Sequence, residues 1–277
     1  MDSVALFMLI WTVLLGLVLG SFLNVLIFRY GTKEGIGGRS HCRTCRHPLS
    51  SWDLVPVFSY LLLRGRCRYC AAAISPQYPL VECSMGILSA GVFLAHPQGV
   101  AYVLGLFMWM GLLFLFVYDL KSLILPFPAL IVTGALGLLS LFLSCAGAYC
   151  EGTLPGILSI AAGPILALPL LALSAVSRGR WMGWGDGLLE LGLGWLLGMT
   201  EGLSALVIGF WSGAIVGLLL IALSHKRMST LVPASTAQGG ASGFTMKSEL
   251  PFAPFLILGA AVAYFFHVDL FSALFSL

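Results

Sequence analysis

Two pairs of closely spaced cysteines lie in the N-terminal third of the chain. They read Cys42-Arg-Thr-Cys45 and Cys67-Arg-Tyr-Cys70, with 21 residues between the pairs. Each pair can offer two thiolates to one metal ion, and the chain between them can bring the pairs together, as in tetrahedral zinc sites. Four free thiols or a redox-active pair are the alternatives. We expect these four cysteines to hold one structural Zn²⁺ ion.

Two aspartates lie at the ends of apolar stretches much further along the chain. Asp119 follows Tyr118, and Asp186 lies in the segment Gly183-Trp184-Gly185-Asp186-Gly187. A carboxylate in or beside a membrane span is costly and usually marks a site. Two converging carboxylates cannot both ionise comfortably, so one keeps a proton while the other can take one from water, as in an aspartic-protease dyad. Alternatively, each aspartate pairs with a nearby basic residue or caps a helix.

Three further acidic residues lie in or near apolar stretches. Glu190 falls one helical turn after Asp186 and could share its face of the helix. Glu82 lies in the half of its stretch that is nearer the basic loops, where it could join a pocket. For Asp269, toward the opposite side, we expect a structural role.

The composition indicates which elements must position these residues. Of the 277 residues, 59% are hydrophobic and 9% are charged, and the mean hydropathy is +1.01. A water-soluble domain carries about 25% charged residues. Disorder, a collagen-like fibre and a small disulfide-rich secreted domain are therefore excluded, and a polytopic membrane protein remains. The continuous apolar runs favour helices over the alternating strands of a membrane barrel.

Eight apolar stretches can each supply a membrane-spanning helix, which takes about 20 residues. We expect an all-α polytopic membrane protein of about eight transmembrane helices with a small zinc-bound cytoplasmic subdomain. The stretches are residues 4–28, 78–95, 100–118, 127–145, 154–176, 181–198, 203–223 and 252–275. The organisation that follows is a first span in 1–28, the four-cysteine subdomain in 29–77, six spans carrying the aspartates in 78–223, a flexible cytoplasmic linker in 224–250 and a last span in 251–277. No internal repeat is evident.

The basic residues predict the orientation of the spans. All 14 Lys and Arg residues fall in alternate connections, and hence on one side of the membrane. The positive-inside rule makes that side cytoplasmic and both termini periplasmic. The net charge of +3 then reflects topology and contact with the lipid bilayer, and not nucleic-acid binding. Cys145 and Cys150 lie at the outer end of a span and could form a disulfide.

Several ordered motifs together resemble the type IV prepilin peptidases, also called leader peptidase/N-methyltransferases. The resemblance covers most of the chain, and the ordered set is specific, whereas a single G-x-G-D motif would be weak. The matching segments are Gly20-Ser21-Phe22-Leu23-Asn24-Val25, the paired cysteines, residues 52–61 and 63–67, Tyr78-Pro79-Leu80-Val81-Glu82, Asp119 with Pro126, Gly183-x-Gly185-Asp186 and residues 251–256.

The resemblance implies a bifunctional enzyme of the bacterial inner membrane. It would cut the basic leader from prepilins or pseudopilins of a type IV pilus or type II secretion system on the cytoplasmic side, with Asp119 and Asp186 as the peptidase pair. It would then methylate the new N-terminal amine with S-adenosylmethionine. No motif defines the residues that hold this cofactor. Glu82, Asn24 and Asp53 are candidates because they lie in matching segments near the cytoplasmic face.

The sequence departs from the family pattern at two positions. Phe127 follows Pro126 where the family often has an acidic residue, and Leu188 stands where the family usually has a lysine. Loss of the lysine removes a charge that could stabilise the ionised pair or bind substrate. These two departures therefore bear on the expected rate, pH optimum and substrate range more than on the expected type of reaction.

Two rival functions stand beside this one. A peptidase without methyltransferase activity is the closer rival, but the short family members of that kind lack the cysteine-bearing insert. A transporter that uses Asp119 and Asp186 as proton-relay groups is the other. Transporters more often place such acids near the membrane midplane, within broken helices or inverted repeats.

Overall fold

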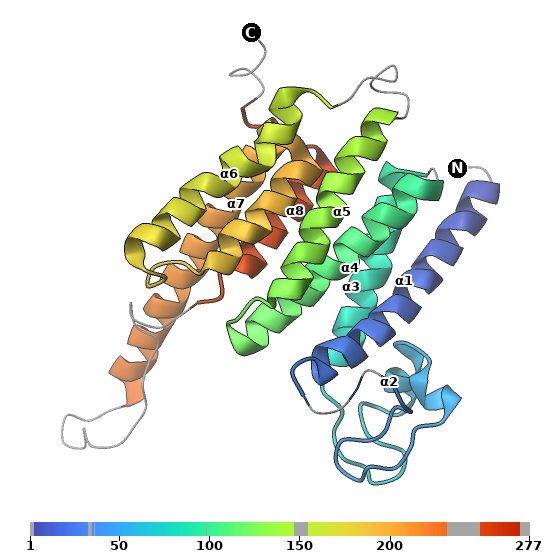
Figure 1. Cartoon of the computed structure of the whole chain (residues 1–277). Coiled ribbons are helices and arrows are strands. Elements are labelled where there is room, and N and C mark those ends of the chain that lie inside the picture. The colour runs from blue at the N-terminus through green and yellow to red at the C-terminus, as the bar shows by residue number, and fades with distance from the viewer. Residues whose placement is uncertain are drawn as a thin grey trace. The chain divides into compact units, whose positions relative to one another are not determined.

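The computed structural model describes residues 3–32, 35, 37–97, 99–146, 155–231 and 250–271 of the chain. Within these residues the fold is built from helices, as expected (Figure 1). They are α1 (Ser3–Arg29), the 3-10 helix η1 (Ser51–Leu54), α2 (Phe58–Leu62), α3 (Gln77–Ala95), α4 (Gly99–Ser122), α5 (Phe127–Ala146), α6 (Ile157–Ser177), α7 (Trp184–Leu231) and α8 (Ala253–Phe266).

All the expected apolar stretches fall on these helices, and the all-α polytopic membrane fold is confirmed. Among the described residues, α1, α3, α4, α6 and α7 are long and apolar enough to cross a membrane, and α5 and α8 are shorter apolar helices. The sixth and seventh expected spans lie on one element, α7, which is kinked at Gly198. The backbone of Gly198 has φ 77° and ψ −172°. Glycine suits this kink because it adopts positive φ without the steric penalty of a Cβ atom.

Two elements end elsewhere than the sequence predicted. Helix α8 is shorter than the expected span, because His267 takes a left-handed conformation and caps the helix through a backbone hydrogen bond to Ala263. Helix α7 continues to Leu231. The possible disulfide between Cys145 and Cys150 lies outside what the structure describes, as do residues 232–249 of the expected linker.

The chain divides into two compact units, and unit 1 comprises Met1–Tyr118 and Ile131–Pro155. In this unit α1 and α3 pack side by side (Figure 1). A Cβ atom on Gly16 would lie 2.6 Å from the carbonyl oxygen of Met85, and one on Gly20 would lie 2.7 Å from the Cα atom of Glu82. Small residues four positions apart allow such close approach of helices in membranes. The two glycines therefore set Glu82 directly against α1.

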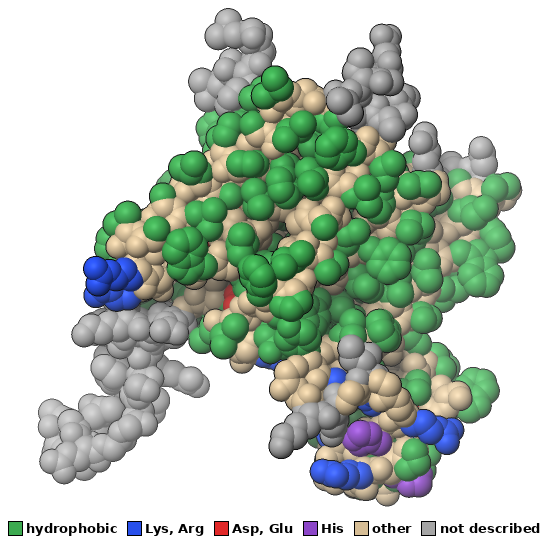
Figure 2. Space-filling model, viewed as in Figure 1, with side chains coloured by type: hydrophobic (Ala, Val, Ile, Leu, Met, Phe, Trp, Pro, Cys, Tyr) green, Lys and Arg blue, Asp and Glu red, His purple; other side chains and the backbone are tan. Residues whose placement is uncertain are grey.

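The chain between α1 and α3 forms the insert that carries the cysteines, at the C-terminal end of α1 (Figure 1). It contains η1, α2 and two isolated β-bridges, one between His41 and Pro48 and one between Arg66 and Ala73. Figure 2 shows hydrophobic side chains covering the viewed face of the helices, whereas Lys, Arg and His side chains gather on the insert. The insert thus has a surface suited to water beside helices suited to lipid.

Unit 2 comprises Asp119–Leu130 and Gly156–Leu277. In this unit α7 packs against both α6 and α8. The backbones of α6 and α7 meet closely, since a Cβ atom on Gly194 would lie 2.7 Å from the Cα atom of Gly163. The indole N–H of Trp195, the next residue of α7, donates a 2.9 Å hydrogen bond to the carbonyl oxygen of Ile160. These contacts hold the first half of α7 against α6. This half of the helix carries Gly185 and Asp186 of the G-x-G-D motif.

Candidate active site and metal centre

Asp186 lies in the first turn of α7, within unit 2. Its side chain is buried, and the residue is 7% exposed. The backbone N–H of Gly183, which precedes the helix, donates a 3.2 Å hydrogen bond to Oδ2 of Asp186. A carboxylate at this position also interacts favourably with the positive end of the helix dipole. The start of α7 therefore fixes the orientation of Asp186.

Asp119 is also buried and 5% exposed. It belongs to the last turn of α4, but its carboxylate accepts a hydrogen bond from the backbone N–H of Ala253, the first residue of α8. Pro254 follows in the first turn of α8, where proline is favoured because the missing N–H would have no helical partner. Each aspartate is therefore held by a backbone N–H at the start of a helix.

The second glycine of the G-x-G-D motif brings the two aspartate-bearing segments together. A Cβ atom on Gly185 would lie 2.9 Å from the side chain of Leu125, which belongs to the turn that follows Asp119. Any larger residue would push this turn away from α7. The charges of Asp119 and Asp186 are close enough to act on each other.

Glu190 lies one turn after Asp186 on α7, and residues four apart share a helix face. It is 1% exposed, and its Oε1 atom has no hydrogen-bond partner among the described residues. Unit 2 thus buries three carboxyl groups. The two departures from the family pattern add no charge to unit 2, because Phe127 and Leu188 are both apolar. Phe127 is exposed, and Leu188 is half-buried.

The paired aspartates can perform acid–base chemistry. Two neighbouring carboxyl groups in a poorly solvated site favour a state with a single negative charge, because two like charges repel each other there. The ionised group can then take a proton from a water molecule, and the protonated group can donate a hydrogen bond to a developing oxyanion. Asp119 and Asp186 have the chemistry and the burial that this requires.

The four cysteines come together in the insert of unit 1. Their sulfur atoms all lie within 4.8 Å of one another, and the Sγ atoms of Cys42 and Cys70 are 3.8 Å apart. Four thiolates bound tetrahedrally to one ion at about 2.3 Å would be about 3.8 Å apart. A hydrogen bond from the backbone N–H of Cys45 is the main cause that lowers the pKa of the Cys42 thiol to about 6. The donor set can therefore hold a metal ion.

The two cysteine pairs lie on hairpins with the same backbone hydrogen bonds. In the first, the N–H of Cys42 donates to the oxygen of His47; in the second, the N–H of Cys67 donates to the oxygen of Ala72. The residue after each second cysteine, Arg46 or Ala71, has φ 57°. The insert therefore contains a short structural repeat, which the sequence did not reveal because these contacts are made by the backbone.

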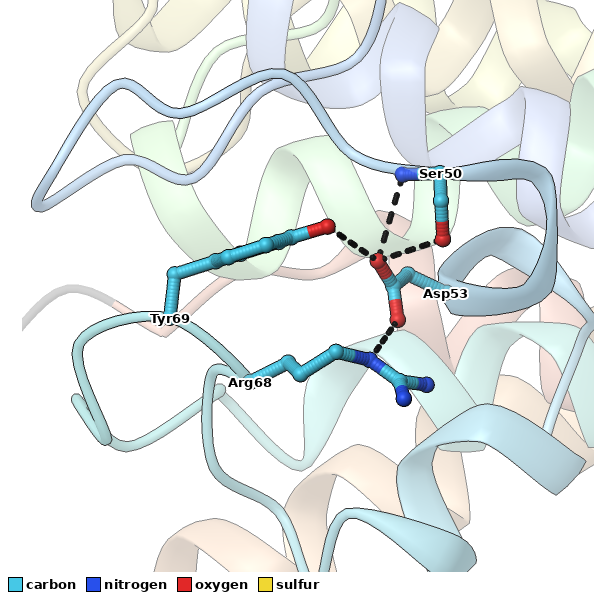
Figure 3. A network of polar contacts seen from close by, with 4 residues as sticks. All are labelled: Ser50, Asp53, Arg68 and Tyr69. Atoms are coloured by element: carbon cyan, nitrogen blue, oxygen red, sulfur yellow. Dashed lines mark hydrogen bonds and ion pairs between the residues drawn. The ribbon is translucent and has the colours of Figure 1, made fainter.

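Asp53 holds the first part of the insert to the second hairpin (Figure 3). Its carboxylate accepts hydrogen bonds from the N–H and hydroxyl of Ser50, from Nε of Arg68 at 2.7 Å and from the hydroxyl of Tyr69 at 3.4 Å. Burial raises the pKa of Asp53, but the hydrogen bonds from Ser50 and Arg68 outweigh burial, and the pKa is lowered. The carboxylate is thus ionised and already has four donors.

Asn24 lies near the C-terminal end of α1, and Glu82 lies near the N-terminal end of α3, which packs against α1. The carboxylate of Glu82 accepts a 2.7 Å hydrogen bond from the backbone N–H of Val57 in the insert and another from the hydroxyl of Ser21. The amide nitrogen of Asn24 donates to the carbonyl oxygen of Tyr78 at 3.1 Å. The Oδ1 atom of Asn24 has no hydrogen-bond partner among the described residues, although the residue is only 1% exposed.

A cavity of about 590 Å³ lies between the ends of α1 and α3 and the insert, entirely within unit 1. Asn24, Glu82 and Asp53 all line it, together with Cys42 and Cys67 of the cysteine cluster. The volume falls in the range of small-molecule sites, which are about 300–1,000 Å³. The three cofactor candidates from the sequence are therefore brought to one place, beside the candidate metal centre.

The chain is similar in sequence to known proteins. Residues 14–96 match the family model described as "Bacterial Peptidase A24 N-terminal domain". The protein named "Prepilin leader peptidase/N-methyltransferase" from Burkholderia pseudomallei (strain 1026b) is 31% identical over 290 residues, covering 93% of this chain and 85% of its own. Proteins of the same name from Aeromonas hydrophila and Pseudomonas aeruginosa are each 31% identical, over 79% and 80% of this chain and 83% and 84% of their own. No solved structure matches the chain.

The fold and the buried acids define an integral membrane protein with a candidate acid–base centre in one unit and a candidate metal centre in the other. The similarity over nearly the whole chain makes the identification specific. The chain belongs to the prepilin leader peptidase/N-methyltransferase family.

Proposed function

We propose that this protein is a membrane aspartyl peptidase of the inner membrane that removes the basic leader of type IV prepilins or pseudopilins and then N-methylates the new N-terminal residue. The observation that carries the peptidase part is the burial of Asp119 and Asp186, each held by a backbone N–H at the start of a helix. Family membership supports both activities.

In the proposed cleavage, Asp119 and Asp186 share one proton. The ionised carboxylate takes a proton from water as the water oxygen attacks the scissile carbonyl carbon. The protonated carboxyl donates a hydrogen bond to the carbonyl oxygen, which gains negative charge in the transition state. The N–H groups of Gly183 and Ala253 keep the carboxylates in place, so little reorganisation is needed when the substrate arrives.

The membrane setting fits a substrate that has a basic leader followed by an apolar helix. The apolar helix would lie in the bilayer among the spans, and the basic leader would remain on the cytoplasmic side near the acids. This orientation rests on the distribution of Lys and Arg in the sequence and puts both termini in the periplasm. Accessibility of single cysteines to a membrane-impermeant reagent tests it, since residue 2 should react from outside and the insert should not.

We further propose that Cys42, Cys45, Cys67 and Cys70 bind Zn²⁺. Tetrahedral sites of four thiolates are typical of structural zinc, and the ion supplies a link between segments that have little apolar core. S-adenosylmethionine is the proposed methyl donor, and when bound it supplies an electrophilic methyl group. The cavity of about 590 Å³ in unit 1 is large enough for such a ligand.

Mass spectrometry of a prepilin co-expressed with this protein tests both activities at once. We expect the prepilin to lose its leader and to gain the mass of one methyl group on the new N-terminal residue. A prepilin that keeps its leader would contradict the proposed function. A prepilin that is cut but never methylated would support the rival function of a peptidase alone. Among the described residues, no observation favours the transporter.

A further inference from the structure

We propose that the insert docks on the membrane surface through an exposed apolar patch, and that the arginines beside this patch hold anionic phospholipid headgroups. The patch consists of Trp52 of η1 and Phe58, Leu61 and Leu62 of α2, and we call it the α2 patch. Such docking requires only that unit 1 is embedded in a membrane, and it does not depend on either proposed catalytic activity.

The side chains of the α2 patch are large and apolar, and yet they are exposed. Trp52 is 76% exposed, and Phe58, Leu61 and Leu62 are 54%, 66% and 65% exposed. The three residues of α2 are spaced i, i+3 and i+4, so they share one face of the helix. Trp52, Phe58 and Leu62 also line one open groove of about 370 Å³. A continuous apolar patch on an otherwise polar segment indicates contact with a membrane or with another protein.

The start of α2 lies at the level of the first turns of α3. The backbone N–H of Val57, the N-cap residue of α2, donates a 2.7 Å hydrogen bond to the carboxylate of Glu82. Glu82 lies only about 7–8 Å along the helix axis from Gln77, the first residue of α3. With 19 residues, α3 is about as long as the hydrocarbon core is thick. The α2 patch is therefore near the boundary between lipid tails and headgroups, where Trp side chains are enriched.

Arg68 adds a fixed positive group to the groove. Its side chain lines the groove beside Trp52 and Phe58, and half of it is exposed. Among the described residues, Arg68 bonds through Nε alone, to the carboxylate of Asp53 at 2.7 Å (Figure 3). This ion pair holds the guanidinium in place and leaves its two terminal nitrogens for another acceptor. Arginine binds phosphate groups through parallel N–H···O bonds, so a phospholipid headgroup fits this position.

The charge of the insert favours lipid over two other occupants, a prepilin and a second copy of the chain. Residues 29–77 contain eight Lys and Arg residues and two acidic residues. Arg64 and Arg66 are exposed directly after α2, whereas the side chain of Asp53 is 2% exposed. The basic leader of a prepilin, or the insert of a second copy, would bring further positive charge to this surface. Anionic headgroups attract it, because each basic side chain near such a membrane surface contributes to binding.

Docking would also stabilise a segment that has little core of its own. Within the described part of the insert, Cys67 is the only buried hydrophobic residue. Tyr60 and Leu63, at α2, line the cavity of about 590 Å³ in unit 1. Contact between the α2 patch and the bilayer would therefore hold one wall of this cavity in place.

Electron paramagnetic resonance of the full-length protein, in vesicles that contain phosphatidylglycerol, tests this docking. The spin label is carried by p-acetylphenylalanine in place of Leu61 or Leu62, which leaves every cysteine unmodified. Both labels should collide more often with oxygen, which concentrates in lipid, than with a water-soluble nickel chelate. The label in place of Ile87, which is 72% exposed on α3, is the lipid reference, and the label in place of Pro48, an exposed residue of the first hairpin, is the water reference. Labels on α2 that behave like the water reference would overturn the proposal.

The role of charge is tested with the label in place of Leu62. Replacing phosphatidylglycerol by phosphatidylcholine should lower the ratio of oxygen to nickel collisions at least about twofold, and so should Arg64→Gln combined with Arg66→Gln. The matched control is Arg178→Gln combined with Arg180→Gln, which removes the same charge from unit 2 and should leave the ratio unchanged. A ratio that does not respond to lipid charge would overturn the assignment of anionic headgroups.

Photocrosslinking in native membranes identifies the occupant directly. With p-benzoylphenylalanine in place of Phe58, mass spectrometry should find an adduct with the mass of a phospholipid. The same photoreactive residue in place of Ile87 is the positive control for lipid contact. An adduct with a prepilin or with a second copy of the chain would overturn the proposal, as would the absence of a lipid adduct at Phe58 when the control gives one.

Discussion

The backbone N–H of Ala253, at the first position of α8, donates a hydrogen bond to the carboxylate of Asp119, which lies in the last turn of α4. The two residues are far apart in the sequence, and both belong to unit 2. The contact links the start of α8 to one of the two proposed catalytic acids. Through this contact α8 helps to position Asp119, which the composition of α8 does not suggest.

Ala253→Pro removes this N–H while keeping a residue that is favoured at the start of a helix. A hydrogen bond to a charged group is worth about 1.5–3 kcal/mol, so we expect kcat for leader cleavage to fall about 10- to 100-fold. Ala253→Val is the matched control, because valine has a similar volume and retains the N–H. Equal losses in the two variants would show that packing, and not the hydrogen bond, matters at this position.

Gly185→Ala tests the close contact between the G-x-G-D motif and the turn after Asp119. The new Cβ atom would lie 2.9 Å from the side chain of Leu125, and overpacking of this kind costs about 1–3 kcal/mol. We expect leader cleavage to slow at least about tenfold as the two aspartates move apart. Adding Leu125→Ala should restore much of the rate, measured with purified prepilin. A double variant as slow as Gly185→Ala alone would argue against this explanation.

The metal centre can be tested by measuring zinc content. Wild-type protein purified with zinc should contain one ion per chain, and Cys67→Ser should lose it, because a thiolate ligand is replaced by a poor one. Removal of the ion should also expose the insert to proteolysis. Cys83→Ser is the control, since Cys83 is a free cysteine on α3 outside the cluster. Full zinc occupancy in Cys67→Ser would contradict the four-cysteine site.

Asp53→Asn tests the ion pair that joins the two parts of the insert. The pKa of Asp53 is lowered in the folded protein, so its charge stabilises the insert above the ordinary carboxyl range, and this contribution is lost as the pH falls through the lowered pKa. The effect should be small, at most about 1 kcal/mol, because half of the Arg68 side chain is exposed and screened by solvent. Zinc release to a chelator at pH 7 should be faster in the variant. Identical release rates at pH 7 and low salt would show that the pair does not stabilise the insert.

The sequence predicted the parts of this account that depend on residue type and spacing. Long apolar stretches predicted the helices, because lipid leaves backbone groups to be satisfied within each segment. The spacing of the cysteines predicted their cluster, which the structure brings within 4.8 Å. The two aspartates were predicted as acids at the ends of apolar stretches, and the three cofactor candidates from their place in matching segments. The structure puts each group of residues within a single unit.

Other features could not be predicted, because they depend on backbone atoms or on tertiary packing. The contact of Asp119 with Ala253 and that of Glu82 with Val57 both use a backbone N–H, which every residue except proline possesses. The repeated hairpins share hydrogen bonds but little sequence beyond the cysteines. The free oxygen of Asn24 becomes evident only when its neighbours are in place. The kink at Gly198 within α7 falls where the sixth expected span ends, but residue type alone does not show that this glycine, among the 33 in the chain, takes a positive φ.

The rate of leader cleavage by purified Asp119→Asn and Asp186→Asn variants tests the peptidase mechanism most directly. Asparagine keeps an oxygen to accept the N–H of Ala253 or Gly183 but cannot exchange the proton that the mechanism requires. Each variant should therefore lose about 10²–10⁴-fold in rate and still bind the methyl donor, whereas Asp269→Asn, at an exposed acid after α8, should cleave normally. Cleavage at the wild-type rate by either the Asp119 or the Asp186 variant would contradict the shared-proton pair.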